Sequence, residues 1–288
     1  MLTKTATLIV NGGHLEGNSY AICGNGNPDR INTKLVINGG KLSVKSATGT
    51  AIFQPQDGET IVNGGEIKGA SGFEIRSGKL EVNGGTIIGT AVPVEVHPNG
   101  SGTTSTGAGI AVAQHTTKLP IEVVIKGGTI QGYSALYQSN PQKNEAEAVA
   151  KIKITVKGGV LETINGGEQV LYSENNLITV EAGEFSGELP EDVTTPEDSK
   201  VYEVEVEKEN GETETKYVVA TEDELEETPI IEDSEVVTKE DKKELLEELD
   251  EILTGVADEI KKLEAIEEPS DEELEQLKMF QELENVYS

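Results

Sequence analysis

The stretch VNGGEIKG, residues 62–69, is one of seven closely related phrases in the first two thirds of the chain. The others are VNGGHLEG at 10–17, INGGKLSV at 37–44, VNGGTIIG at 82–89, IKGGTIQG at 125–132, VKGGVLET at 156–163 and VEAGEFSG at 180–187. Successive phrases are 20 to 43 residues apart. Periods of this size are typical of proteins built from stacked structural repeats.

Each repeat contains three short runs that read as β-strands. A run such as LEV precedes the glycine pair, a second run follows it with one inward apolar residue, and a third run such as TAIF, FEIR, VPVEV or SALY comes next. The inward residues are Leu15, Leu42, Ile67, Ile87, Ile130, Leu161 and Phe185. Strands this short leave no room for a helix within a coil, so we expect parallel strands that pair from one coil to the next.

The glycine pair has a structural reason in such a stack. A tight bend between strands needs positive φ angles, which glycine adopts at little cost. Asparagine tolerates similar angles and can bond through its amide to equivalent residues above and below. The sequence therefore predicts a ladder of stacked turn residues that ends where Lys126 replaces asparagine; its members are Asn11, Asn38, Asn63 and Asn83.

Residues 5–190 resemble the right-handed parallel β-helices of pectate-lyase-like proteins. The NGG phrases resemble more closely the glycine-rich repeats of phage structural proteins and bacterial surface proteins. The resemblance implies a mainly β fold, a right-handed parallel β-helix (solenoid) of about seven coils over residues 1–190. It says much about fold and little about activity, because one fold hosts many functions.

A change in composition marks a different C-terminal region. Residues 1–190 carry 17 acidic and 14 basic side chains, whereas residues 191–288 carry 36 and 9. Within 191–235 we expect a β-hairpin, with Asn210-Gly211 in its turn, and then an acidic linker. The hairpin is expected to close the end of the stack, because an open end exposes unpaired strand edges.

Residues 236–288 change to a helical period and predict a two-helix, coiled-coil-like hairpin. Apolar residues step by three and four positions along the first helix, and Pro269 ends it. The stripe could pack within the hairpin or serve oligomerisation or docking; its members are Leu246, Leu249, Leu253, Val256, Ile260 and Leu263.

Charge and residue usage exclude several classes of partner and site. A net charge of −30 disfavours nucleic acid and anionic membranes, and no apolar run approaches the ~20 residues of a membrane span. The lone Cys23 reads as a buried small hydrophobe. His14, His97 and His115 lack metal-ligand spacing, so we predict no metal and no cofactor.

The resemblance implies that a lyase would carry aspartates that hold calcium and an arginine or lysine that abstracts a proton, and that a hydrolase would carry clustered aspartates as general acid and base. The chain offers no such motif. Asp29 and Asp57 are the only aspartates of residues 1–190. The nearest approach to a carboxylate pair is Asp57 with Glu59, joined by Glu66 or Glu74 if the register allows. We expect solvated acids there, and no catalytic residues.

Sugar binding usually needs exposed aromatic rings. The chain has no Trp, and four rings fall at apolar positions of the repeat, namely Tyr20, Phe53, Tyr137 and Tyr172. The candidate surface for a glycan or a cell surface is therefore the pair of insertion loops around 97–118 and 138–150.

These features favour a non-enzymatic structural protein. The chain enters its repeat without an apolar signal segment, which favours synthesis in a host cytoplasm and assembly into a phage virion as a head-fibre, tail-fibre or decoration protein. The expected partners are further copies, with a trimer favoured, and other virion proteins. The alternatives are a fragment of a bacterial cell-surface adhesin, and a polysaccharide lyase or hydrolase.

Overall fold

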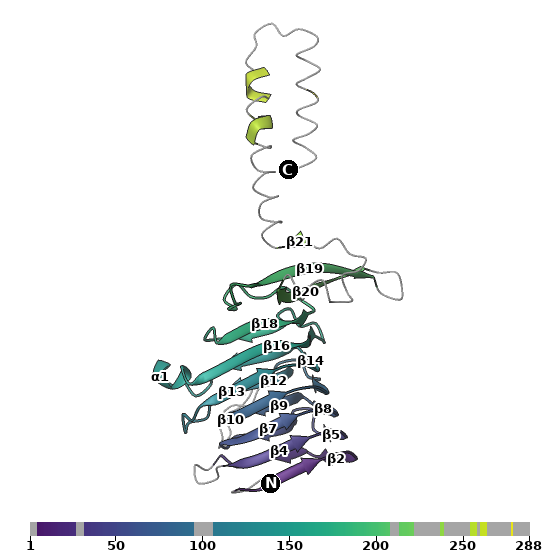
Figure 1. Cartoon of the computed structure of the whole chain (residues 1–288), viewed down its shortest axis with the longest axis vertical. Coiled ribbons are helices and arrows are strands. Elements are labelled where there is room, and N and C mark those ends of the chain that lie inside the picture. Colours follow the sequence, from purple (N-terminus) through teal and green to yellow (C-terminus); the bar gives the residue numbers. More distant parts are fainter. Residues whose placement is uncertain are drawn as a thin grey trace. The chain divides into compact units, whose positions relative to one another are not determined.

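The computed structural model describes residues 5–26, 32–94, 106–207, 213–221, 237–238, 254–257, 260–263 and 278. The chain divides into two compact units, Met1–Val236 and Val237–Ser288. The first unit is mainly β, with parallel strands stacked on one another (Figure 1).

The strands of the first unit form three faces that the chain visits in turn. The first face contains β1 (Thr7–Val10), β4 (Thr33–Ile37), β7 (Gly58–Val62), β10 (Gly78–Val82), β13 (Ile121–Ile125), β16 (Ile152–Thr163) and β18 (Ile178–Phe185). The second face contains β2 (His14–Gly17), β5 (Lys41–Val44), β8 (Glu66–Gly69), β11 (Thr86–Gly89), β14 (Thr129–Gly132) and the end of β16. The third face contains β3 (Ile22–Cys23), β6 (Thr50–Gln54), β9 (Ser71–Ile75), β12 (Ala108–Ala113), β15 (Ser134–Ser139) and β17 (Leu171–Ser173).

Equivalent strands pair in parallel from one layer to the next, where a layer is one passage of the chain over the faces. The first-face order is β1-β4-β7-β10-β13-β16, and the third-face order is β17-β15-β12-β9-β6-β3. The described strands make seven layers, the last of which contributes β18. The expected parallel pairing of short strands is therefore confirmed.

The core is a set of apolar rows that run through the layers. In-register positions along the second face are occupied by Leu42, Ile67, Ile87, Ile130 and Leu161, all fully buried. Each row repeats because successive side chains of a strand point to opposite sides, so that the equivalent position in every layer faces inward.

Leu15, in the first layer, differs from the later members of its row. We expected it to point inward, yet its exposed fraction is 40%. It pairs with Leu42 on one side. A residue in the outermost layer has packing partners on one side only, so its burial is incomplete.

The glycine corner works as the sequence indicated. Gly65 has φ +88°, and a Cβ there would lie 2.7 Å from the carbonyl oxygen of Gly40 in the layer before. Gly85 repeats this geometry with φ +84° and a contact of 2.8 Å to Gly65. Both the backbone angle and the close approach of the layers therefore require glycine.

The third run of the fourth repeat was assigned wrongly. Residues 92–94 of VPVEV form no strand, and Val92 and Val94 are exposed by 52% and 55%. The third-face strand of this layer is β12, which follows the glycine-rich insertion. VPVEV has strand-like alternation, but Pro93 interrupts the ladder donors that a central strand needs.

The second insertion contains the short helix α1 (Ala146–Val149), which lies outside the repeat rather than within a coil. Ala148 and Val149 are buried against the column. Gln114 donates hydrogen bonds to the carbonyl oxygens of Leu119 and Ala148, so a buried amide satisfies backbone groups of this irregular corner.

The predicted hairpin is present as β19 (Ser199–Glu207) and β20 (Thr213–Thr221), which pair antiparallel. Its turn at Asn210-Gly211 lies outside the described residues. β20 also pairs antiparallel with β18, with Phe185 opposite Tyr217. The hairpin thus satisfies the edge of the last parallel layer, as expected.

The second unit contains β21 (Val237–Thr238) and helical residues at 254–257, 260–263 and 278. Val256 and Ile260, two members of the predicted apolar stripe, are buried in the single chain, and Leu263 is partly buried. The stripe members Leu246, Leu249 and Leu253 lie outside the described residues. The division into a repeat, a hairpin with linker, and a helical segment remains a prediction at its boundaries.

Candidate functional site

The four asparagines of the glycine corner lie one above another and are joined by amide hydrogen bonds. Asn38 Nδ2 donates to Asn11 Oδ1 at 2.8 Å, Asn63 Nδ2 to Asn38 Oδ1 at 2.8 Å, and Asn83 Nδ2 to Asn63 Oδ1 at 2.9 Å. These bonds all run in one direction along the exposed edge of the column. The ladder is a structural device that fixes neighbouring layers in register.

Ion pairs replace the amides after the fourth layer. Lys126 lies 3.1 Å from Glu81, and Lys157 lies 2.9 Å from Glu181. Hydrogen bonds from Lys126 and then Asn83 hold the pKa of Glu81 below its usual range. Ion pairs thus join the fourth layer to the fifth and the sixth to the seventh, whereas the fifth and sixth layers, whose corners carry Lys126 and Lys157, are joined by backbone pairing.

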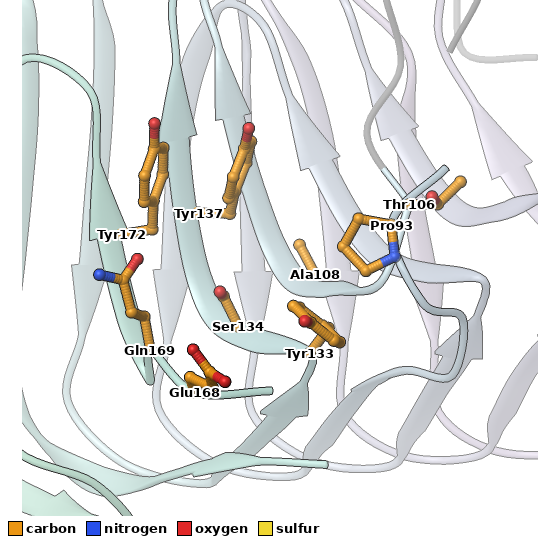
Figure 2. Close-up of a pocket in the computed structure, with 9 residues that line it drawn as sticks. All are labelled: Pro93, Thr106, Ala108, Tyr133, Ser134, Tyr137, Glu168, Gln169 and Tyr172. Carbon is orange, nitrogen blue, oxygen red and sulfur yellow. The ribbon is translucent and has the colours of Figure 1, made fainter. Parts of the chain in front are cut away.

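A pocket opens on the outer side of the third face, where β12, β15 and β17 lie in successive layers (Figure 2). Its volume is about 260 Å³. It is lined by Pro93, Thr106, Ala108, Tyr133, Ser134, Tyr137, Glu168, Gln169 and Tyr172. The sequence pointed to the insertion loops around 97–118 and 138–150, and Thr106 and Ala108 of the first range do line the pocket, but its tyrosines were not expected there.

Two parallel tyrosine rings form one side of this pocket. Tyr137 and Tyr172 occupy in-register positions of β15 and β17, and their ring centroids are 4.7 Å apart with an interplanar angle of 12°. Figure 2 shows both hydroxyl groups pointing the same way, with Ser134 and Glu168 near the opposite end of the rings.

The sequence analysis assigned Tyr137 and Tyr172 to apolar positions of the repeat. This assignment was wrong, because both side chains face outward and not toward the core. Their neighbours Leu136 and Leu171 are fully buried in the core, so alternation turns the tyrosines to the outer face. Both tyrosines are only partly buried. A count of strand parity from Leu136 would have found this surface.

The outer row that holds the tyrosines continues through the earlier layers. Ala111 is in register with Tyr137, followed by Glu74 and Phe53. At the far end Tyr20 stacks on Phe53 at 5.4 Å between ring centroids. Phe53 is buried, as expected, whereas Tyr20 is partly exposed.

Glu74 and Arg76 form a fully buried ion pair in this row. The Glu74 Oε1 oxygen accepts from Arg76 Nε at 2.8 Å and lies 2.7 Å from Arg76 Nη2. Arg76 also lies over the ring of Phe53, 5.6 Å from its centroid. Burial raises the pKa of the Glu74 carboxyl to about 7, although Arg76 opposes the shift.

The acids considered as a catalytic group are kept apart by their partners. Glu59 pairs with Lys34 at 2.8 Å, and Glu66 with Lys41 at 2.7 Å, in each case across two layers. Glu74 lies in the buried pair with Arg76. The part of the chain that the structure describes contains no group of three or more His, Cys, Asp and Glu side chains placed to hold a metal.

The histidines are also separated. His14 Nε2 lies 2.7 Å from Ser43 Oγ on the exposed second face, and His97 lies outside the described residues. His115 is buried, and burial followed by the charge of Arg76 lowers its pKa. Cys23 is partly buried rather than fully so.

Among the helices of the described ranges, none has the length and apolar character that spanning a bilayer requires. Comparison of the chain with protein-family models, with curated proteins and with solved structures found no match.

Proposed function

We propose that the chain is a non-enzymatic structural protein whose layers form a right-handed parallel β-helix. The layers provide a rigid arm, and the helical segment provides an attachment or self-association element, with a trimer favoured. The arm belongs to a phage virion, as a head-fibre, tail-fibre or decoration protein that assembles with other virion proteins.

The observation that carries this proposal is the continuity of inter-layer bonding. Backbone pairing runs through every layer, the asparagine ladder joins the first four corners, and ion pairs join the fourth layer to the fifth and the sixth to the seventh. Bonding of this kind resists bending and sliding between layers, which suits a load-bearing arm better than a hinged binding domain. The glycine-rich phrases supply the resemblance to phage proteins.

Light scattering on the full chain tests the fibre assembly. We expect a mass three times that of the 30.7 kDa chain. Val256 and Ile260 are already buried in one chain, so a trimer must use other side chains of the helical segment or rearrange it. A strict monomer at all concentrations would contradict the trimeric fibre, and an experimental map with left-handed winding would contradict the β-helix.

A bacterial cell-surface adhesin is the second candidate, favoured by the outward tyrosine pocket. The two proposals differ in their gene neighbourhood, because capsid or tail genes beside this gene support the virion and wall-anchoring genes support the adhesin. A lyase or hydrolase is tested by incubation with acidic polysaccharides, with and without calcium. We expect no cleavage products, since Glu59 and Glu66 are each held by a lysine.

A further inference from the structure

The tyrosine pocket has features of a ligand site that the structural role does not require. We propose that it binds one neutral or amino-hexose unit of a glycan, with the sugar ring against the tyrosine rings. This binding activity goes beyond the proposed arm and would stand if the virion assignment were wrong.

The size of the pocket suits a single sugar ring. Its volume of about 260 Å³ lies just below the ~300–1,000 Å³ of pockets that take drug-sized ligands. Tyr172 covers one face of Tyr137, and the in-register neighbour on the other side is Ala111, whose methyl group is too short to cover that ring. Figure 2 shows Pro93 and Thr106 on this other side of Tyr137, so the ring and the proline bound a slot.

The polar groups of the pocket suit a ligand that carries hydroxyls. Glu168 and Gln169 are exposed and come from the segment that leads into β17. Within the part of the chain that the structure describes, no hydrogen bond occupies either of these two side chains. A carboxylate and a carboxamide beside an aromatic face can bond to sugar hydroxyls while the ring covers the apolar CH face.

The same geometry disfavours other small ligands. Tyr137 and Tyr172 are nearly parallel, at 12° and 4.7 Å, so they face each other and cannot enclose a quaternary ammonium from two sides. A purely aromatic ligand would cover the rings but leave the polar groups of Glu168 and Gln169 without partners.

The charge of the site selects among sugars. The ionisable residues that line the pocket are Glu168 and tyrosines, and no lysine, arginine or histidine of the described residues lines it. Glu174 lies close enough to act on Tyr137, whose pKa is raised by burial first and then by Tyr172 and Glu174. A uronic acid would bring a second negative charge into this environment, so we expect neutral and amino sugars to bind better than uronic acids.

The test is a saturation-transfer NMR titration of the full chain with methyl glycosides of glucose, galactose and mannose, with glucosamine and galactosamine, and with glucuronate and galacturonate. We expect at least one neutral or amino sugar to bind with a Kd of about 1 mM, as suits a single ring. Matching uronates should bind at least several-fold more weakly. If no neutral or amino sugar binds, or if the uronates bind best, the proposal is wrong.

Variants of the pocket assign the binding to its residues. Tyr137→Ala should weaken binding about tenfold, whereas Tyr137→Phe, which keeps the ring that bounds the slot, should stay within about twofold. The matched control is Tyr20→Ala, which removes a stacked tyrosine of the same face outside the pocket and should leave the Kd unchanged. Equal loss in Tyr137→Ala and Tyr20→Ala would contradict the assignment.

Glu168→Gln tests the charge argument without removing a ring. We expect this variant to keep its neutral-sugar Kd within about threefold and to bind uronates about two- to fivefold better than the natural chain, because a nearby unit charge contributes about 1 kcal/mol in water. An unchanged preference against uronates would contradict the role given to Glu168. These results do not depend on oligomeric mass, so failure of the sugar site and failure of the fibre are separate outcomes.

Discussion

At the scale of single residues, the glycine corner shows two separate constraints on one position. Gly13, in the first layer, has φ +84° and no atom within 4 Å of the place that a Cβ would occupy, whereas Gly85 combines the same φ with a backbone contact of 2.8 Å. Gly12 has neither constraint. The three positions separate the cost of backbone strain from the cost of pushing two layers apart.

We therefore expect a graded series of alanine variants. Gly85→Ala should lower the free energy of unfolding by about 2–4 kcal/mol, because strain and clash combine. Gly13→Ala should cost about 1–2 kcal/mol from strain alone, and Gly12→Ala should stay within about 0.5 kcal/mol. Urea denaturation followed by circular dichroism measures all three, and equal losses at Gly13 and Gly85 would contradict the close approach of the layers.

The raised pKa of Glu74 predicts that the free energy of unfolding depends on pH. Its pKa rises from 4.5 to about 7 on burial, so between these values the folded chain binds more protons than the unfolded chain. Its contribution to the free energy of unfolding is therefore greatest at low pH and declines as the pH rises through about 7. Over this window the decline should be on the order of 1–3 kcal/mol.

The measurement compares the natural chain with Glu74→Gln from pH 4 to pH 8. The variant should lack this decline, because an amide does not titrate, so the stability of the natural chain relative to the variant should fall as the pH rises through about 7. His115 titrates nearby in both proteins, so the difference between the two curves isolates Glu74. A difference that grows with rising pH would show that the ion pair, rather than burial, controls the carboxyl.

At the scale of elements, register is set by rows of charge as well as by rows of apolar residues. Lys34, Glu59, Lys79, Glu122 and Lys153 occupy in-register positions in five successive layers of the first face. Opposite charges are neighbours throughout, and the ion pairs of this row include Lys34–Glu59 at 2.8 Å and Lys79–Glu122 at 2.8 Å. If a layer paired with the next layer but one, two side chains of like charge would become neighbours. The row therefore disfavours such misregistered stacking.

Charge reversal within this row should be more damaging than charge removal. Glu59→Lys places three positive charges in succession and should cost about 1–2 kcal/mol at low salt, whereas Glu59→Gln should cost less than about 1 kcal/mol. About 1 M salt shortens the Debye length to ~3 Å and should restore most of the loss in Glu59→Lys. Denaturation at both salt concentrations checks this, and a loss that ignores salt would point to packing instead.

The elements that the sequence predicted well are those beside a residue pattern that recurs in each layer. The Asn-Gly-Gly corner needs the same backbone in each layer, so strands on both sides of it could be placed in order, as could the ladder from Asn11 to Asn83. The third-face strand β12 was missed because Pro93 and a long insertion break the local pattern. The tyrosine pocket was missed because it depends on which side of β15 Tyr137 faces, and on three layers coming together.

At the scale of the whole first unit, the two ends of the stack differ. The last parallel strand, β18, has β16 on one side and β20 on the other. Among the described residues, β1 pairs only with β4, and Ile9 is exposed by 55%. In a stacked-repeat protein each layer is stabilised by its neighbours, so a layer with one neighbour opens at lower free energy than a layer with two.

Amide hydrogen exchange should therefore be graded along the stack. We expect the amides of β1 and β2 to exchange roughly 100-fold faster than those of β10 and β13, which corresponds to an opening free energy lower by about 2–3 kcal/mol. β18 should stay close to the central strands in protection, because β20 covers its edge. Val219→Pro provides the internal control, since it removes a donor in β20 opposite Gly183 and should speed exchange in β18 while leaving β1 unchanged. Equal protection of β1 and β10 in the natural chain would mean that the first layer has a neighbour on its other side, and would point to association through that end.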